Sequence, residues 1–327
     1  MKILILSNVF PPGFIGGYEL GALDIGLGLK RLGHEIQVLT SDYFLDDSET
    51  IQELTISRTL RCSLLSHDFV PAEIFEWHGL FYDVHNIRML SSAIRKFLPD
   101  LVLLFNIAGL GAVSIVQFLD KIRMPTVLYL MDNVFSGLDK RSELFNRYTK
   151  IIGGTQLGAS IKVIAMSKTL SNEVSETLGI DLGTLAFVPG WVDLDVIGKT
   201  KIVPKVDGCT RFVFCSQVAP HKGTDLIVEA TSQLVKNGFC HFFIDMFGPG
   251  QVGPFLNKVK ARNLDDYIKY QGIVRKANML SIFSRYDALL FPTWVREPFG
   301  FVVSEAAASG CFPIITNGCG ASEWFFN

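Results

Sequence analysis

YDALLFPTWVREPFGFVVSEAAASGCFPIIT, residues Tyr286–Thr316, decides the fold class. A short apolar run over Ala288–Phe291 is followed by a loop, a helical pattern over Phe301–Ser309 and a second apolar run over Phe312–Thr316. Continuous apolar runs separated by helices are typical of parallel strands that are covered on both faces. This stretch therefore predicts one strand–helix–strand unit of a doubly wound α/β sheet.

The same alternation continues on the N-terminal side of this stretch through most of the 327 residues. In the first half, we predict strands at Lys2–Ser7, Glu35–Thr40, Asp100–Phe105, Thr126–Met131 and Lys162–Met166, and helices at Glu19–Arg31, Val84–Phe97 and Thr169–Leu178. In the second half, we predict strands at Arg211–Cys215, Cys240–Phe247 and Ile268–Gln271, and helices at Thr224–Lys236, Pro254–Arg262 and Lys276–Ser284. A polar stretch without a clear period lies between the halves. We therefore expect an N-terminal domain over residues 1–192, a linker over 193–210 and a C-terminal domain over 211–327, with ligands bound in the cleft between the domains.

Composition and charge exclude several classes of protein. Hydrophobic residues make up 49% of the chain and charged residues 19%, which is enough apolar content for a core in each half. The net charge of −2 gives no indication of nucleic acid as a partner. The six cysteines form no C-x-x-C pair and no zinc-spaced cluster with histidine, so we expect reduced thiols in a cytoplasmic protein.

Three features of the sequence bear on membrane association. The N-terminus MKILILSNVF lacks a small-residue cleavage site and predicts a buried first strand, not a signal peptide. No apolar stretch is long enough to span a bilayer. The amphipathic stretch Asn86–Asp100 is expected to pack on the sheet, with a membrane surface as the alternative.

The aromatic-rich segment Ser41–Tyr82 fits the alternation poorly, so we expect a packed surface insertion, with a functional loop as the alternative.

Two loops after predicted strands carry residue types that suit phosphate. In NVFPPGFIGGYELG, Gly16 and Gly17 precede a helix expected to start near Tyr18. They either let backbone N–H groups approach a phosphate or sugar, or only shape a tight turn. In SQVAPHKGTDLIVEA, Lys222 lies beside Gly223 at a helix start, where a cation and free N–H groups can form a diphosphate site. A solvated lysine is the alternative.

The stretch GPGQVG, Gly248–Gly253, matches G-x-G-x-x-G after a strand. The dinucleotide fingerprint requires an acidic residue at the end of the following strand, and IKYQGIV has none. We therefore interpret Gly248 and Gly250 as part of a loop near the ligand or as a simple turn.

The opening stretch holds two glutamates with seven residues between them. Glu297 lies on the loop, Gly300 allows close backbone approach, and Glu305 lies one turn into the helix, which Gly310 is expected to end. The two carboxylates can bind sugar hydroxyls, with helix-end N–H groups on a phosphate between them. A capping acid plus a surface acid fits the spacing equally well.

Together, these motifs resemble the retaining, GT-B-fold glycosyltransferases of glycosyltransferase family 4, over nearly the whole chain. FPPGFIGGYELGALDIGLGLKRLGHEIQVLT is similar to that family's N-terminal motif, and VPGWVD, Val188–Asp193, is similar to its Asn-Gly-Val-Asp junction. YDALLFPTWVREPFGFVVSEAAASGCFPIITNGCGASEWF resembles its donor-site signature. The resemblance implies α/β, GT-B architecture, in which two Rossmann-like doubly wound domains face a cleft.

The resemblance also implies a role for each matched residue. Glu297 would bind hydroxyls of the donor sugar, Glu305 would bind the nucleotide ribose, and Lys222 would neutralise the departing diphosphate. Asp132, in YLMDN, matches the Asp of a His-Asp pair near the acceptor. The other implied donor-site residues are Phe299, Gly300 and Phe301 through backbone N–H groups, Gly272 and Ile273 at the base, Gly248 and Gln217, and Gly16 and Gly17 from the other domain.

Three features depart from the family pattern. Gln217 stands where the family usually has an arginine beside the donor phosphates, and Met131 replaces the histidine before Asp132. The chain stops at Asn327, whereas family members usually continue through further helices, so we expect a truncated chain or an unusually short domain.

The resemblance implies a retaining hexosyltransferase that moves a sugar from a nucleotide-diphospho-sugar to a glycan or lipid-linked acceptor, as in polysaccharide biosynthesis. A UDP-sugar is the favoured donor, and peripheral membrane contact is compatible with such acceptors. No cofactor and no metal are implied, because Lys222 and helix ends would supply the positive potential. The alternatives are a nucleotide-sugar binding protein with weak or no catalysis, a sugar-nucleotide epimerase of the same fold and, last, an NAD-dependent dehydrogenase.

Overall fold

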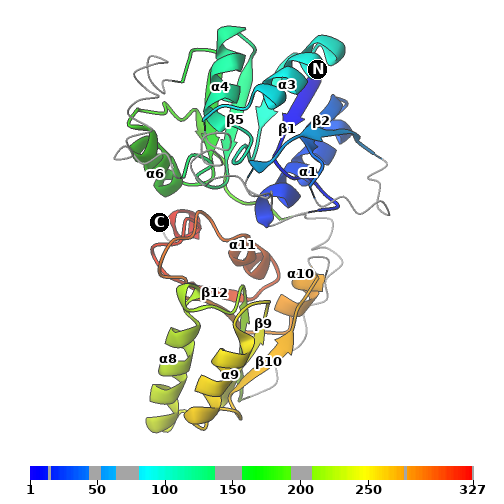
Figure 1. Cartoon of the computed structure of the whole chain (residues 1–327). Helices are drawn as coiled ribbons and strands as arrows, with labels where there is room; N and C mark the ends of the chain where they lie inside the picture. Colours follow the sequence, from blue (N-terminus) through cyan, green and yellow to red (C-terminus); the bar gives the residue numbers. More distant parts are fainter. Residues whose placement is uncertain are drawn as a thin grey trace. The chain divides into compact units, whose positions relative to one another are not determined.

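The computed structural model describes residues 1–13, 16–43, 53–63, 81–136, 157–192, 208–275 and 278–325. The chain divides into two compact units, Met1–Val188 (unit 1) and Pro189–Asn327 (unit 2). Each unit combines a parallel sheet with helices (Figure 1), as the alternation of strand and helix patterns predicts. The expected linker lies outside the described residues, apart from its last three positions.

Unit 1 is built on a parallel sheet whose described strands lie in the order β3-β2-β1-β4-β5-β6-β7. The strands are β1 (Lys2–Leu6), β2 (Glu35–Ser41), β3 (Thr55–Leu60), β4 (Leu101–Leu104), β5 (Thr126–Leu130), β6 (Ile161–Ala165) and β7 (Ala186–Phe187). The helices are α1 (Gly17–Arg31), α3 (Val84–Phe97), α4 (Ala112–Lys121) and α6 (Lys168–Leu178). The central strand β1 is apolar on both faces, and its residues Leu4, Ile5 and Leu6 are fully buried, as expected for a strand covered on both sides.

Strand β3 corrects part of the interpretation of Ser41–Tyr82 as a surface insertion, whereas residues 44–52 and 64–80 of this segment lie outside the described residues. Thr55–Leu60 pairs in parallel with β2 and belongs to the sheet. The sequence TISRTL hides this strand, because an edge strand is only partly buried and therefore lacks a continuous apolar run. Arg58 in β3 donates from Nη1 to the carbonyl oxygen of Phe10 at 3.1 Å and from Nη2 to that of Pro11 at 2.5 Å. This edge strand therefore supports the loop that follows β1.

Helix α3 has the bounds that the sequence predicts. Its residues Leu90, Ala93 and Phe97 are buried, so the amphipathic pattern is explained by packing within unit 1. Within the described part of the chain, no helix combines the length and the apolarity needed to cross a membrane.

Unit 2 has a parallel sheet whose described strands lie in the order β10-β9-β8-β11-β12. The strands are β8 (Thr210–Cys215), β9 (Phe242–Phe247), β10 (Ile268–Gly272), β11 (Ala288–Phe291) and β12 (Phe312–Ile315). The helices are α8 (Thr224–Lys236), α9 (Val252–Ala261), α10 (Met279–Phe283), α11 (Phe301–Ala308) and α12 (Ser322–Phe325), and a short 3₁₀ turn spans Pro220–Lys222. Strand order reverses between β8 and β11, and in such sheets the reversal point is where ligands bind.

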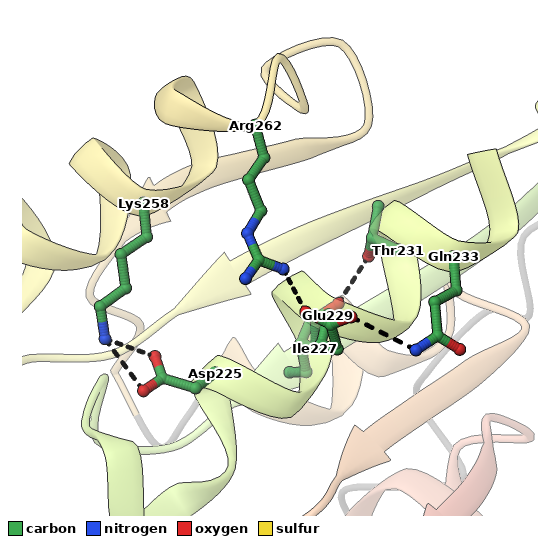
Figure 2. Close-up of polar contacts among 7 residues, drawn as sticks. All are labelled: Asp225, Ile227, Glu229, Thr231, Gln233, Lys258 and Arg262. Carbon is green, nitrogen blue, oxygen red and sulfur yellow. Dashed lines mark hydrogen bonds and ion pairs between the residues drawn. The ribbon is translucent and has the colours of Figure 1, made fainter. Parts of the chain in front are cut away.

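Helices α8 and α9 lie side by side in unit 2 (Figure 1). Towards the sheet they bury Ile227, Val228, Phe255 and Val259 in an apolar core with residues of β8, β9 and β10. On the outside, Lys258 Nζ contacts both carboxylate oxygens of Asp225 at 2.8 and 2.9 Å, and Arg262 pairs with Glu229 (Figure 2). Hydrogen bonds from Arg262 and Gln233 lower the pKa of Glu229. These groups are about half exposed, so burial of the inner face rather than the ion pairs holds the two helices together.

Candidate active site

The strand order of unit 2 brings two of the predicted loops together. β8 and β11 are neighbouring parallel strands, with Ala288 opposite Phe212 and Leu289 opposite Val213. The loop after β8 carries Lys222 and the loop after β11 carries Glu297, so both open at the carboxyl edge of the sheet.

A glycine allows the Lys222 turn to approach β11 closely. Gly223, the residue before α8, has φ +79°, and a Cβ atom there would lie 2.1 Å from the carbonyl oxygen of Pro292. Only glycine fits both this backbone conformation and this contact. The close approach therefore positions Lys222 against the loop that follows β11.

Lys222 and Glu297 form an ion pair within this edge. Lys222 Nζ lies 2.7 Å from Glu297 Oε2, and the two side chains are only 18% and 15% exposed. Trp294 Nε1 donates to the carbonyl oxygen of Pro220 at 2.9 Å, which joins the β11 loop to the Lys222 turn a second time. The structure thus shows neither a freely solvated lysine nor an isolated surface acid.

The Glu297 loop is fixed by a second segment, Cys319–Ala321. The backbone N–H of Gly320 donates to the carbonyl oxygen of Glu297 at 2.9 Å, and that of Ala321 donates to Phe299 at 3.0 Å. The Cys319 thiol lies 2.9 Å from the same Phe299 oxygen. Burial, with the Glu297 carboxylate adding to it, raises the pKa of the Cys319 thiol to about 12, so the thiol is neutral and donates this bond.

This arrangement orients the N-terminus of α11. The peptide between Phe299 and Gly300 is trans, so its N–H points opposite to the carbonyl that Cys319 and Ala321 hold. Gly300 has φ +90° and directly precedes α11, whose first N–H groups have no partner within the helix. The predicted backbone donors of Gly300 and Phe301 therefore follow directly after a carbonyl group, that of Phe299, which is held by Cys319 and Ala321.

Glu305 lies one turn into α11 and is half-buried. Its charge and, more strongly, burial raise the pKa of the Cys215 thiol at the end of β8 to about 12. Glu297 contacts Lys222 after the same strand, so both predicted carboxylates lie near the carboxyl end of β8. Gln217, two residues beyond β8, is exposed there.

Two residues of the junction motif Val188–Asp193, Gly190 and Trp191, pack against the aromatic side chains of the same loop and of α11. Phe299 is buried, and a Cβ atom on Gly190 would lie 2.2 Å from its ring. The Phe301 ring packs edge-to-face against Phe299, with centroids 5.8 Å apart, and against Trp191, with centroids 5.4 Å apart. The Phe299 side chain therefore has a packing role, while its predicted ligand contact concerns the backbone alone. Trp191 had no assigned role in the sequence.

The loops after β9 and β10 lie next to one another. The Gly248 N–H donates to the carbonyl oxygen of Gly272 at 2.9 Å, and the Tyr270 hydroxyl donates to the Gly248 carbonyl at the same distance. Ile273, the predicted base contact, is 71% exposed. The stretch Gly248–Gly253 connects β9 to α9, so its interpretation as a loop near the ligand or as a simple turn stays a prediction.

In unit 1, a buried carboxylate already occupies part of the predicted Gly16–Gly17 site. Glu19 is 1% exposed; its Oε2 accepts from the Gly16 N–H at 2.9 Å and its Oε1 accepts from Asn106 Nδ2 at 3.3 Å. The spacing of a helix start and a glutamate three residues later is a known capping signal that could have identified this contact. Gly17 is exposed at the first helical position.

Asp132 is exposed just after β5, and its Oδ1 accepts from the Asn133 N–H at 2.6 Å. Met131, at the position of the family's histidine, is buried. The Tyr18 hydroxyl donates to the carbonyl oxygen of Tyr129 at 2.7 Å, which brings the start of α1 to the end of β5. Burial raises the pKa of Tyr18, so this anchor is a neutral phenol. The predicted unit 1 residues thus lie near one another at the carboxyl ends of β1 and β5.

The described residues contain no group of three or more His, Cys, Asp or Glu side chains placed to hold a metal ion. The expectation of a metal-independent reaction remains a prediction.

Comparison with known proteins identifies the family. Residues 15–196 match the family model described as Glycosyltransferase Family 4, and residues 199–326 match the model described as Glycosyl transferases group 1. A curated relative, an uncharacterized glycosyltransferase of Methanocaldococcus jannaschii, is 22% identical over 98% of this chain and 81% of its own length.

Solved structures of glycosyltransferases share the fold. The sucrose-phosphate synthase of Thermosynechococcus elongatus has a TM-score of 0.71 at 16% identity, covering 99% of this chain and 82% of that one. The Anabaena protein HepE, in complex with UDP-glucose, has a TM-score of 0.62 at 18% identity, with the same coverage of both chains. The chain therefore has the GT-B fold and belongs to glycosyltransferase family 4.

Proposed function

We propose that this chain is a hexosyltransferase that moves a sugar from a nucleotide-diphospho-sugar to a glycan or lipid-linked acceptor with retention of the anomeric configuration. A UDP-sugar is the favoured donor. The observation that carries the proposal is the mostly buried Lys222–Glu297 ion pair, which lies beside the N-terminus of α11 with Glu305 one turn further along. A cation, oriented backbone N–H groups and two carboxylates are the groups that a diphosphate, a sugar and a ribose require.

In this proposal each group acts on one part of the donor. Glu297 accepts hydrogen bonds from sugar hydroxyls, and Glu305 accepts them from the ribose. Lys222 and the N-terminus of α11 stabilise the diphosphate as negative charge develops on it. The bond between the anomeric carbon and the phosphate oxygen breaks, with its electron pair moving to the phosphate. The acceptor oxygen forms the new bond on the same face of the sugar and releases its proton to the departing phosphate.

A structural neighbour supports a nucleotide-sugar donor, but it does not identify the base or the sugar that this chain uses. HepE is a structural neighbour that was solved with UDP and with UDP-glucose. Gly16, Gly17, Gly248, Gly272, Ile273 and Gln217 keep their predicted donor-site roles, and Asp132 keeps its predicted role near the acceptor. A metal-independent reaction in the cytoplasm, with peripheral membrane contact through a lipid-linked acceptor, completes the proposal.

A nucleotide-sugar binding protein without transfer activity is the second candidate. The observation that favours it is the exposed Gln217 near the carboxyl end of β8, where the family usually has an arginine, because one cation for the leaving group is then missing. Binding at Glu297 and Glu305 would persist in such a protein, while transfer would be slow.

Two measurements test the proposal. Thermal unfolding with UDP-, GDP- and ADP-sugars and with NAD should show stabilisation by at least one nucleotide-sugar; stabilisation by NAD alone would reject the proposal. Transfer of radiolabelled sugar to acceptor extracts then separates an enzyme from a binding protein, and conversion of the donor itself would identify an epimerase. Glu297→Ala should abolish transfer while the fold stays native by circular dichroism, although its thermal unfolding temperature should fall because Lys222 stays buried without its partner.

A further inference from the structure

The Lys222–Glu297 ion pair joins two groups that the proposed function assigns to opposite ends of one donor. The pair is 2.7 Å long and more than four-fifths buried on both sides. Separating two buried opposite charges is costly unless each one receives a new partner. A ligand that enters this site must therefore supply a partner for the lysine and another for the glutamate.

We propose that this ion pair makes the site select a nucleotide that still carries its sugar over the bare nucleoside diphosphate, an inference that rests on the proposed function. An intact donor supplies both partners, because its diphosphate is an anion for Lys222 and its sugar hydroxyls donate to Glu297. The bare diphosphate supplies only the anion. It also carries an extra charge on its terminal phosphate, which repels the Glu297 carboxylate.

The backbone on both sides of the pair is fixed, so a bare diphosphate cannot draw the two groups apart by moving the loops. The Glu297 carbonyl accepts from the Gly320 N–H, and the Lys222 turn is held by the packing of Gly223 on Pro292 and by the Trp294 hydrogen bond. When the sugar leaves, Glu297 loses its hydroxyl donors and competes again for Lys222. The ion pair therefore favours release of the spent nucleotide.

Isothermal calorimetry tests this selection by measuring the dissociation constants of UDP and UDP-glucose. The corresponding guanosine or adenosine pair is used if the chain binds that base instead. Glu297→Gln keeps the size and one acceptor oxygen but removes the charge. We expect the variant to bind the bare diphosphate about tenfold more tightly than the wild type, since Lys222 no longer has a competitor. It should bind the nucleotide-sugar more weakly, so the ratio of the two dissociation constants falls at least tenfold.

Glu305→Gln is the matched control. It removes the other carboxylate of the candidate site, which is the one assigned to the ribose. The ribose is present in both ligands, so this variant should weaken both without changing their ratio. In a Lys222→Met background, Glu297→Gln should tighten binding of the bare diphosphate less than it does in the wild-type background, because the contested cation is gone and only the repulsion between Glu297 and the terminal phosphate is relieved. Lys222→Gln replaces Lys222→Met if the latter does not fold, as judged by circular dichroism.

Three results separate the hypotheses. An unchanged or weakened affinity of Glu297→Gln for the bare diphosphate would overturn the inference. The inference would also be overturned if Glu305→Gln tightened binding of the bare diphosphate as much as Glu297→Gln does. Loss of any negative charge near the site would then have the same effect. If the wild type binds none of the nucleotides and none of the nucleotide-sugars, the proposed function is overturned, and this outcome is distinguishable from the two above.

Discussion

Replacement of Gly223 by alanine tests how closely the Lys222 turn packs on β11. Gly223 has φ +79°, and a left-handed conformation costs a non-glycine residue about 1–2 kcal/mol. The new Cβ would lie 2.1 Å from the Pro292 carbonyl oxygen, whereas carbon–oxygen contacts need about 3.3 Å, so the turn must move by about 1.2 Å. Overpacking of this kind costs a further ~1–3 kcal/mol. The total loss of stability is therefore about 2–5 kcal/mol.

Gly238→Ala is a matched control within the same unit. Gly238 has φ +82°, and a Cβ atom there has nothing within 4 Å. Alanine at this position should cost only the conformational term, about 1–2 kcal/mol. The difference between the two variants isolates the contact with Pro292.

Tryptophan fluorescence during urea unfolding is the suitable assay. Three of the four tryptophans, Trp191, Trp294 and Trp324, lie in unit 2, so the signal reports mainly on the unit that carries both mutations. We expect Gly223→Ala to unfold at distinctly lower urea than Gly238→Ala. Equal midpoints for the two variants would refute the close approach of the Lys222 turn to β11, and with it the explanation of how Lys222 reaches Glu297.

Four further predictions concern single side chains. Cys319→Ser keeps a donor to the Phe299 carbonyl, so it should preserve the Michaelis constant for the donor, whereas Cys319→Ala should raise it several-fold with little effect on folding; equal constants would argue against a positioning role. At pH 8 a maleimide should label the exposed Cys240 but not Cys319, whose pKa is raised to about 12, as peptide mass spectrometry would show. The stability that burial of this neutral thiol confers should be complete below its ordinary pKa of 9.0 and be lost between pH 9 and 12, because the unfolded chain ionises first. Arg262→Ala should raise the pKa of Glu229 towards its ordinary value, measured by carbon-13 NMR titration, and an unchanged pKa would contradict the ion pair between α8 and α9.

Most of the fold follows from local sequence patterns. Buried parallel strands such as β1 are continuous apolar runs, and helices such as α3 and α8 have the predicted bounds. β3 was missed because an edge strand needs no apolar run on its exposed side. Thr55–Leu60 is a strand because it pairs with β2, and this pairing leaves no signature in the local sequence.

The candidate site was only partly predictable, because its contacts are made between segments far apart in the sequence. Motif spacing places Glu297 and Lys222 at strand ends, but their pairing depends on β8 and β11 being neighbours in the sheet. Glu19 has a capping-box signal that local reasoning can use. Cys319 and Trp191 have no such signal, since each acts by contacting a loop that another part of the chain provides.

The most direct measurement is a crystal structure of the chain with UDP-glucose. We predict sugar hydroxyls about 3 Å from the Glu297 carboxylate, the ribose at Glu305, and the diphosphate on Lys222 with the Lys222–Glu297 ion pair opened. A nucleotide-sugar bound away from the carboxyl ends of β8 and β11, or one that leaves this ion pair intact, would contradict the proposed donor site.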